Sequence, residues 1–342
     1  MSFSRRSFLL GTAASGLCSF FPDLSLAESS GKPPNIVFLF ADDLGWGDLG
    51  CYGNPRVKTP ALDKLASEGT LFTQFYVAGS VCSPSRAGIM TGQYPARNRV
   101  FGHFAQEANN ERRGMPNSLD PKVPTLTDAL KEVGYVTGHF GKWHLGVISP
   151  KEYGVDVYRT DKASNMPDKP PVDIWSPNAR PTCTKDILDS TLEFIQSAKG
   201  KPFYTNVWFS DVHATLNPSA EQLERTRQFH ANGVDFYGVA QVYYAALLEM
   251  DRQIDHFLEK LDRMGLRDNT LVVFSSDNGP EDYQIRNAAH SGVGLTGPLR
   301  GRKRSIYEGG IRVPFILRWP GHVPSGKVNN DSVLNGVDFV PT

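Results

Sequence analysis

Residues 81–88 place a cysteine and an arginine four positions apart. Proline is tolerated in the first turn of a helix and glycine just past its end, so Pro84 and Gly92 predict a short helix with Cys82 at its N-terminus. Free N–H groups and the positive end of the macrodipole favour anions there. Arg86 would lie one turn further on the same face, with its guanidinium directed at Cys82. The alternative is that Cys82 is a small buried apolar side chain, as most free cysteines are.

Polar side chains also follow three apolar runs that are predicted to be buried strands. Residues 35–40 precede Asp42 and Asp43, residues 270–274 precede Asp277 and Asn278, and residues 202–209 precede His213. Strands buried on both faces are typical of parallel sheets, and ligand sites in such sheets lie outside the carboxyl ends of the strands. Oxygens of Asp and Asn suit a divalent cation. In isolation, the first two acids would more simply begin a turn.

Two other segments carry cations. If residues 141–146 are extended, Lys142 and His144 share a face and reach one site, while Trp143 packs behind them. Lys303 lies in the basic cluster 300–304, which alone would be read as a solvated surface.

The elements that must position these residues alternate between strands and helices. Helices are predicted at 61–68, 123–133, 185–198 and 236–264, and Thr59 and Pro60 would cap the first of them. Further strands are predicted at 71–77 and 135–139. Residues 151–181 are rich in Pro and Asp and have no period, which predicts a long surface insertion.

Composition narrows the class of protein. The chain has 342 residues, of which 40% are hydrophobic and 21% charged, so it is globular and long enough for one large core or two smaller ones. Its 36 basic and 36 acidic side chains cancel, which argues against a nucleic-acid partner. The four cysteines lack metal-finger spacing, and Cys51 and Cys183 are either free or paired.

Residues 1–27 predict a targeting segment. Residues 4–10 have the twin-arginine form, and an apolar run to Phe21 is followed by small residues just before Glu28. The run is too short and too rich in small residues for a permanent membrane anchor. We expect a bacterial protein exported in folded form by the twin-arginine machinery, periplasmic or secreted; a disordered basic tail is the alternative.

Five segments resemble motifs of the formylglycine-dependent sulfatase family and occur in that family's order. They are Asp-Asp-Leu-Gly-Trp-Gly-Asp from Asp42, Cys-Ser-Pro-Ser-Arg from Cys82, Gly-Lys-Trp-His-Leu-Gly from Gly141, Asp-Asn-Gly from Asp277, and Leu-Arg-Gly with Tyr-Glu-Gly-Gly between 299 and 310. Coincidence at all five is very improbable. The chain is therefore identified as a member of this family, within the alkaline-phosphatase-like superfamily. Its residues 95–99 are more similar to the arylsulfatase and N-acetylgalactosamine-6-sulfatase branch than to glucosamine-specific members.

The resemblance implies an α/β fold with a mostly parallel central sheet and helices on both faces. Residues 34–342 would form the catalytic domain, and the smaller C-terminal subdomain of the family would be missing. It also implies one Ca²⁺ ion, held by Asp42, Asp43, Asp277, Asn278 and the modified residue 82. A formylglycine-generating maturation enzyme would oxidise Cys82 to Cα-formylglycine.

The family's mechanism then gives each residue a role. A hydroxyl of hydrated formylglycine attacks sulfur, while Lys142, Lys303 and Arg86 draw charge from the sulfate oxygens. His213, with Lys303, protonates the departing alcohol, and His144 helps deprotonate the second hydroxyl so that sulfate leaves. The Val-His-Ala-Thr context of His213 departs from the family's usual Pro-His-Thr-Pro.

The expected reaction is hydrolysis of sulfate esters, of carbohydrates or aryl alcohols. Two alternatives share the same framework: a phosphonate monoester or phosphodiester hydrolase, and a non-catalytic protein that binds sulfated glycans if Cys82 is unmodified. A zinc phosphatase fits less well, because it would need more His and Asp ligands and a Ser or Thr nucleophile.

Overall fold

Nine strands form one sheet within the residues that the computed structural model describes, which are 32–226, 238–283 and 290–342. The strands are β1 (Asn35–Ala41), β2 (Thr70–Tyr76), β3 (Val136–Gly141), β4 (Val157–Thr160), β5 (Phe203–Trp208), β6 (Thr270–Ser276), β7 (Arg312–Arg318), β8 (Lys327–Asn329) and β9 (Leu334–Asn335). Their order is β4-β3-β5-β1-β6-β7-β2-β8, and β9 also pairs with β2. Strand β7 is antiparallel to both neighbours and the other pairs are parallel, so the predicted mostly parallel sheet is confirmed.

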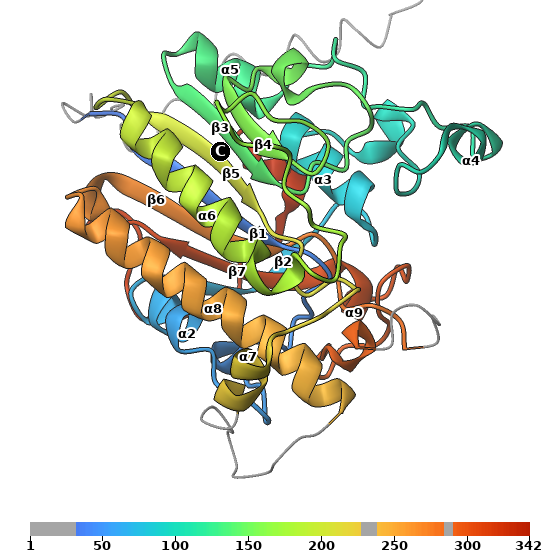
Figure 1. The fold of residues 1–342 in the computed structure, drawn as a ribbon, viewed down its shortest axis with the longest axis vertical. Helices are drawn as coiled ribbons and strands as arrows, with labels where there is room; N and C mark the ends of the chain where they lie inside the picture. The colour runs from blue at the N-terminus through green and yellow to red at the C-terminus, as the bar shows by residue number, and fades with distance from the viewer. Residues whose placement is uncertain (1–31, 227–237, 284–289) are drawn as a thin grey trace, which may run out of the picture. The chain divides into compact units, whose positions relative to one another are not determined.

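Helices cover the sheet. The α-helices are α2 (Pro60–Ser67), α3 (Cys82–Thr91), α4 (Glu107–Arg112), α5 (Leu126–Glu132), α6 (Arg180–Ser197), α7 (Ala220–Arg225), α8 (Val239–Arg263) and α9 (Glu308–Ile311). Short 3-10 helices are η1 (Gly50–Tyr52), η2 (Pro95–Asn98), η3 (Pro150–Tyr153), η5 (Arg267–Asn269), η7 (Ser291–Val293) and η8 (Gly336–Phe339). Helix α6 packs on β3 and β5, and α8 lies alongside α6 and α2 (Figure 1).

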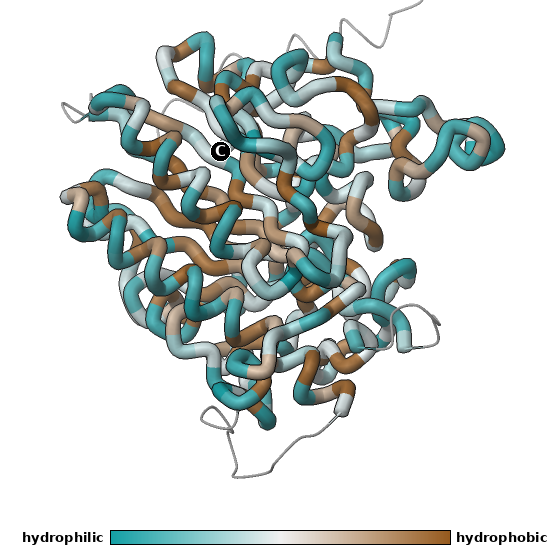
Figure 2. Tube along the Cα trace, viewed as in Figure 1, coloured by the Kyte–Doolittle hydropathy of each residue, from teal (hydrophilic) through white to brown (hydrophobic). Residues whose placement is uncertain are grey.

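Strand β1 shows why helices are needed on both faces. Its side chains alternate, so Val37 and Leu39 join the apolar core beneath α2, α6 and α8, while Phe38 and Phe40 join a second core that contains residues of α3. All four side chains are fully buried. Burial of such a side chain stabilises the fold by about 1.5–3 kcal/mol. The central strands stand out as hydrophobic in Figure 2.

The prediction for residues 151–181 is wrong in part. Val157–Thr160 is not surface loop but strand β4, which pairs in parallel with β3 at the edge of the sheet. Further along, Val172 and Ile174 are buried in the core beneath α6. The segment was misread because its apolar residues are spaced irregularly, with turns between them, and so show no strand or helix period.

The predicted cap of α2 is right in position, since Thr59 is the N-cap residue and Pro60 the first residue of the helix, but wrong in its hydrogen bond. Thr59 makes no side-chain cap; instead its hydroxyl donates to Asp63. The amides of Ala61 and Leu62 donate to the Asp251 carboxylate of α8, at 3.0 and 2.9 Å. A carboxylate from a distant helix therefore replaces the local cap, and it joins α2 to α8.

Two predictions lie wholly or partly outside the described residues. The targeting segment 1–27 is outside them, and so are the first residues of the helix predicted at 236–264, which is observed as α8. In the part of the chain that is described, no helix combines the length and apolar character needed to cross a bilayer.

Candidate functional site

Four neighbouring strands deliver the predicted site residues to one edge of the sheet. In the order β3, β5, β1 and β6 these strands run parallel, so their carboxyl ends coincide. The residues that follow them are Lys142 and His144 after β3, His213 after β5, Asp42 and Asp43 after β1, and Asp277 and Asn278 after β6. This is the edge at which parallel α/β sheets bind ligands.

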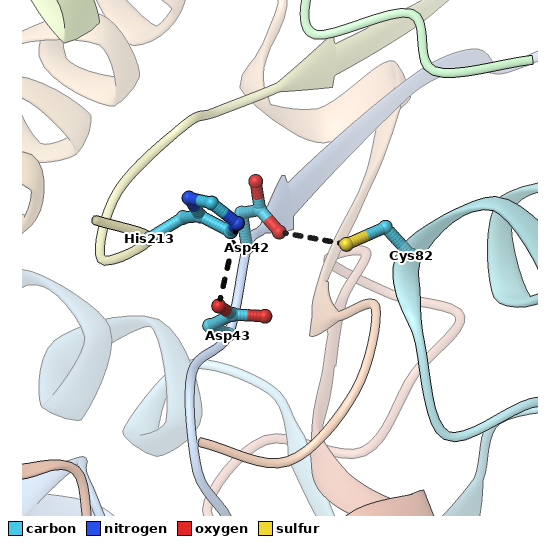
Figure 3. A group of neighbouring side chains, drawn as sticks. All are labelled: Asp42, Asp43, Cys82 and His213. Carbon is cyan, nitrogen blue, oxygen red and sulfur yellow. Dashed lines mark hydrogen bonds and ion pairs between the residues drawn. The ribbon is translucent and has the colours of Figure 1, made fainter. Parts of the chain in front are cut away.

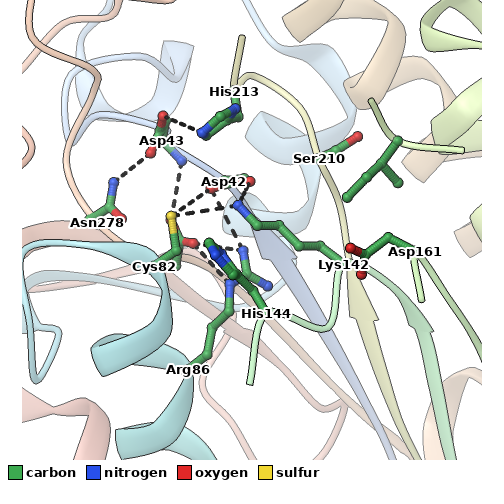
Figure 4. A network of polar contacts seen from close by, with 12 residues as sticks. Asp42, Asp43, Cys82, Arg86, Lys142, His144, Asp161, Ser210, His213 and Asn278 are labelled. Atoms are coloured by element: carbon green, nitrogen blue, oxygen red, sulfur yellow. Dashed lines mark hydrogen bonds and ion pairs between the residues drawn. The ribbon is translucent and has the colours of Figure 1, made fainter. Parts of the chain in front are cut away.

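Cys82 is the first residue of α3 and meets Asp42 and Lys142. Its Sγ lies 3.5 Å from Asp42 Oδ1 and 3.5 Å from Lys142 Nζ, and the Lys142 ammonium is 2.5 Å from Asp42 Oδ2 (Figure 4). All three side chains are buried. Helix α3 ends at Gly92 with φ 61°, so the predicted start and end of this helix are both observed.

Asp43 is the centre of a second group of contacts. Lys303 Nζ lies 2.6 Å from its Oδ1 and 2.7 Å from its Oδ2. Asn278 Nδ2 donates to Oδ1 at 2.7 Å, and His213 Nε2 lies 3.7 Å from Oδ2. The sequence separation between Asp43 and Lys303 is 260 residues, so only the folded chain forms this group.

Asp277 binds Arg86. The guanidinium donates twice to Asp277 Oδ2, from Nε at 3.0 Å and from Nη2 at 2.6 Å, while Oδ1 accepts the Asp43 amide at 3.2 Å. Arg86 thus points at the carboxylates around Cys82. Its Nη2 is also 3.8 Å from Asp42 Oδ1. Three buried carboxylates and three buried cations therefore balance.

Burial and these pairs shift the pKa values in opposite directions. Burial alone would raise the pKa of Asp42, but Lys142, His213 and Arg86 outweigh it and hold that pKa well below its usual range. Burial, reinforced by the Asp42 carboxylate, raises the pKa of Asp277 to about 7. Burial also raises the pKa of the Cys82 thiol, so the thiol is protonated and weakly nucleophilic in this form.

The two histidines are held neutral. Burial, followed by the nearby Lys142 charge, lowers the pKa of His144 well below its usual range. Burial likewise lowers the pKa of His213, against the attraction of Asp43. His213 Nδ1 is 2.5 Å from the Ala214 carbonyl, which only accepts hydrogen bonds, so Nδ1 carries the proton and Nε2 is free to accept one.

The backbone is strained where it turns into the site. Asp43 and His144 both have positive φ, 62° and 51°, a region that costs a side-chain-bearing residue about 1 kcal/mol or more. His144 therefore does not continue the extended segment that we expected. It lines the cavity that contains Cys82, while Lys142 is buried with its Nζ 3.5 Å from Cys82 Sγ, and Trp143 is buried as well.

A close contact between backbones joins two of the motifs. A Cβ on Gly279 would meet the Gly309 carbonyl oxygen at 1.8 Å, and the Gly279 amide donates to the Gly310 carbonyl at 3.0 Å. The Lys303 amide donates to the Pro280 carbonyl at 3.0 Å. Glycine is required at this crossing, and the crossing brings Lys303 to Asp43.

The donor set fits a divalent cation. Ligand atoms of Asp42, Asp43, Cys82 and His213 all lie within 4.8 Å of one another (Figure 3). Asn278 Oδ1 is buried and accepts no hydrogen bond from any described residue. Carboxylate and amide oxygens are the ligands that hard cations prefer. Of the predicted ligands, Asp277 already accepts hydrogen bonds at both oxygens, from Arg86 and from the Asp43 amide.

A cavity of about 590 Å³ opens above these residues. It is lined by Cys82, His144, His213 and Lys303 of the predicted site. The remaining lining residues are Val81, His103, Phe104, Ala105, Gln106, Asn109, Asn117, Gly146, Val147, Asp161, Lys162, Trp175 and Arg304. The volume lies within the range of small-molecule sites.

The structure thus brings all ten predicted site residues to one place, and their chemical roles remain predictions. It adds Asp161, Trp175 and Glu281, which the sequence analysis did not single out. Asp161 accepts the Trp143 amide at 2.9 Å, and Glu281 lies 3.3 Å from Lys303 Nζ. Asp161 and Trp175 come from the segment that we read as a surface insertion. The dipeptide Pro280-Glu281 directly after Asn278-Gly279 was a usable signal for Glu281.

Comparison with known proteins agrees with this geometry. Residues 34–342 match the family model described as Sulfatase. Rat N-acetylgalactosamine-6-sulfatase is 32% identical over 371 aligned positions, which cover 93% of this chain and 67% of that protein. Human arylsulfatase A is 33% identical, covering 91% of this chain and 63% of that protein.

A solved structure is similar too. The crystal structure of Ps i-CgsB in complex with k-i-k-neocarrahexaose matches with a TM-score of 0.74 and 27% identity, covering 91% of this chain and 71% of that one. The chain spans about 60–67% of the length of the curated relatives it matches.

Proposed function

The chain belongs to the sulfatase family, and we propose that it hydrolyses sulfate esters in the cavity above Cys82, with Cα-formylglycine at position 82 as the nucleophile. One observation carries the proposal: the Cys82 side chain points from the first turn of α3 into a buried cluster of three carboxylates and three cations. A hydrated aldehyde here would supply the hydroxyl nucleophile that the protonated thiol does not.

The cations of this cluster are suited to a sulfate group. Lys142 Nζ already lies 3.5 Å from Cys82 Sγ, so it can bind an oxygen of a sulfate that approaches residue 82. Arg86 Nη1 is buried without a hydrogen-bond partner among the described residues, and the guanidinium adds a fixed positive charge 3.8 Å from Asp42. Fixed donors of this kind stabilise the charge that develops as the S–O bond breaks.

His213 and Lys303 are suited to the leaving alcohol. Burial would lower the pKa of Lys303, but Asp43 outweighs it and holds that pKa well above the usual range, so the ammonium keeps its proton. His213 Nε2 faces the same carboxylate and is the ring nitrogen able to receive and pass on a proton. His144 is neutral and lines the cavity beside Cys82, where it can accept a proton from the nucleophile.

A divalent cation, which we propose to be Ca²⁺, would be held by Asp42, Asp43, Asn278 and residue 82, with Asp277 completing the set. When bound, it would neutralise sulfate charge and favour the ionised nucleophile. Asn278 Oδ1 supports this assignment, because a buried carbonyl oxygen without a donor is costly unless it is coordinated.

We propose a sulfated carbohydrate as the substrate class. The relatives named above include an N-acetylgalactosamine-6-sulfatase, and the similar structure of Ps i-CgsB holds k-i-k-neocarrahexaose. The polar wall of the cavity, with Gln106, Asn109 and Asn117, is consistent with a ligand that carries several hydroxyl groups. An aryl sulfate would not use this wall.

The test is chemical. Protein purified from the exported fraction of a bacterial host is digested, and the peptide that contains residue 82 is weighed. We expect replacement of the thiol by a carbonyl oxygen, and turnover of a sulfate ester that Cys82→Ala abolishes and Cys51→Ala retains. An intact thiol would favour the glycan-binding alternative. Much faster hydrolysis of a phosphodiester than of the sulfate ester would favour the phosphonate or phosphodiester hydrolase.

A further inference from the structure

Trp175 projects into the cavity although no motif contains it. The residue is 46% exposed, and it lines the same cavity as Cys82. Lys142 Nζ lies over the ring at 5.6 Å from the centroid, and the His213 ring meets it edge to face at 5.9 Å. The indole is therefore next to the cation proposed for the sulfate and next to the histidine proposed for the leaving group.

The residues around Trp175 hold it in place. Asp173 Oδ1 accepts the amides of Trp175 and Ser176, at 3.1 and 2.8 Å, which closes a turn. The preceding Ile174 is buried at 1% exposure, and its carbonyl accepts from Arg180 Nη1 at 3.1 Å. These contacts fix the backbone on both sides of the exposed ring.

Arg180 connects this turn to His213. Its Nη2 donates to the His213 carbonyl at 2.7 Å and to Asp211 Oδ1 at 3.1 Å, while Nη1 holds Ile174. The guanidinium is buried. One side chain thus sets the position of Trp175 relative to His213, as a binding surface for part of a substrate requires.

A purely structural role does not account for this arrangement. Lys142 is already paired with Asp42 at 2.5 Å and needs no aromatic cover, and nearly half of the Trp175 surface faces solvent. Large exposed aromatic surface inside a cavity is typical of ligand contact.

We propose that Trp175 is the platform on which the sugar ring that carries the sulfate stacks, so that this site is specific for sulfated pyranosides. The inference rests on the proposed function and defines its substrate class. With the sulfate at Lys142 and the ester oxygen at His213, the attached ring would lie beside the indole, which is next to both residues. The apolar C–H face of a pyranose packs on an aromatic face, while its hydroxyls reach Gln106, Asn109 and Asn117.

The test compares Trp175→Ala and Trp175→Phe with the wild type on two esters, a sulfated methyl hexopyranoside and a short alkyl sulfate. For the Ala variant we expect KM for the sugar ester to rise about tenfold, with kcat within about twofold and the alkyl sulfate hardly affected. The KM of the Phe variant for the sugar ester should lie between those of the wild type and the Ala variant. The matched control is Tyr94→Ala, an exposed aromatic that does not line the cavity.

Two results would overturn the platform. Equal loss on both esters would show that Trp175 only positions Lys142 and His213, and an unchanged KM for the sugar would show that it binds nothing. Calorimetric binding of the sulfated hexopyranoside to the thiol form of each variant needs no turnover. If the wild type binds the sugar through Trp175 but hydrolyses no ester, the proposed function is wrong and the role of Trp175 as a sugar platform still holds. Thermal denaturation checks that the variants fold, and the Phe variant preserves the packing if the Ala variant does not.

Discussion

Arg86 and Asp277 form a fully buried ion pair, with Arg86 Nη2 2.6 Å from Asp277 Oδ2. Neither side chain is exposed to solvent. Asp277 is a predicted metal ligand, and Arg86 a predicted sulfate contact, so two functional groups also stabilise each other. A substitution at either position therefore acts on stability as well as on function.

We predict that Asp277→Ala destabilises the fold by about 3–5 kcal/mol, because it leaves the Arg86 charge buried without its partner. The double variant Arg86→Met with Asp277→Ala should recover much of that loss, since it removes both charges. Urea denaturation of the two single variants and the double variant measures this coupling.

The control for that cycle is Glu259→Ala, which breaks the exposed pair of Glu259 with Arg263 and should cost less than about 1 kcal/mol. A double variant that is as unstable as the sum of its singles would refute the coupling.

Lys303 should oppose cation binding while it supports catalysis. Its Nζ lies within 2.7 Å of both oxygens of Asp43, so an ion must share or displace it. We predict that Lys303→Met abolishes turnover but tightens Ca²⁺ binding about tenfold. Calorimetric titration with Ca²⁺ measures this, with Lys327→Met on the exposed strand β8 as the control. Weaker Ca²⁺ binding by Lys303→Met would contradict the proposed ligand set.

Asp251 should make stability depend on pH. Burial raises its pKa to about 7, although the amides of Ala61 and Leu62 oppose the shift. In the unfolded chain the pKa is about 4, so the folded state binds the proton more tightly and loses stability as pH rises from about 4 to about 7. The loss is on the order of 4 kcal/mol.

Asp251→Asn removes this titration. We therefore compare the free energy of unfolding of the wild type with that of the variant, by chemical denaturation at pH 5 and pH 8. We predict that the difference, wild type minus variant, is larger at pH 5 than at pH 8. A difference that is constant with pH, or larger at pH 8, would show that Asp251 is ionised throughout and acts only as a helix cap.

The twin-arginine prediction can be tested in cells. Replacement of both Arg5 and Arg6 by lysine should abolish export, because the twin-arginine machinery recognises the arginine pair. Fractionation and immunoblotting locate the protein. Replacement of Arg97 and Arg99 by lysine, outside the leader, should leave export unchanged. If the variant that lacks both leader arginines is still exported, another route is used.

Much of the sheet and many of the site residues could be predicted from the sequence. Strands β1 and β6 are largely apolar runs followed by polar residues, so both their burial and the edge at which they end could be predicted. Strand β5 is equally buried, although Thr205 and Asn206 interrupt its apolar run. Asp43, Cys82 and Lys303 lie in segments that resemble family motifs, which placed them together before any distance was known.

The remainder depends on contacts between distant parts of the chain. Asp251 caps α2 from 190 positions away, and no local pattern marks it. Trp175 lies between irregularly spaced apolar residues in a Pro-rich stretch, and its position follows from Arg180, which also binds near His213. Periodicity reports which face of an element is buried, not which distant side chain it meets.

The burial of residue 82 limits when this residue can be modified. In the folded chain Cys82 is 2% exposed and lies in the wall of the cavity. An enzyme that oxidises this thiol must therefore reach it while the segment is still extended, before α3 docks on the sheet. For a chain exported in folded form, as residues 4–10 predict, that interval ends before export. If the modification and this export route both hold, the reactive group must be made in the cytoplasm before folding, and a chain that folds first would be exported without it.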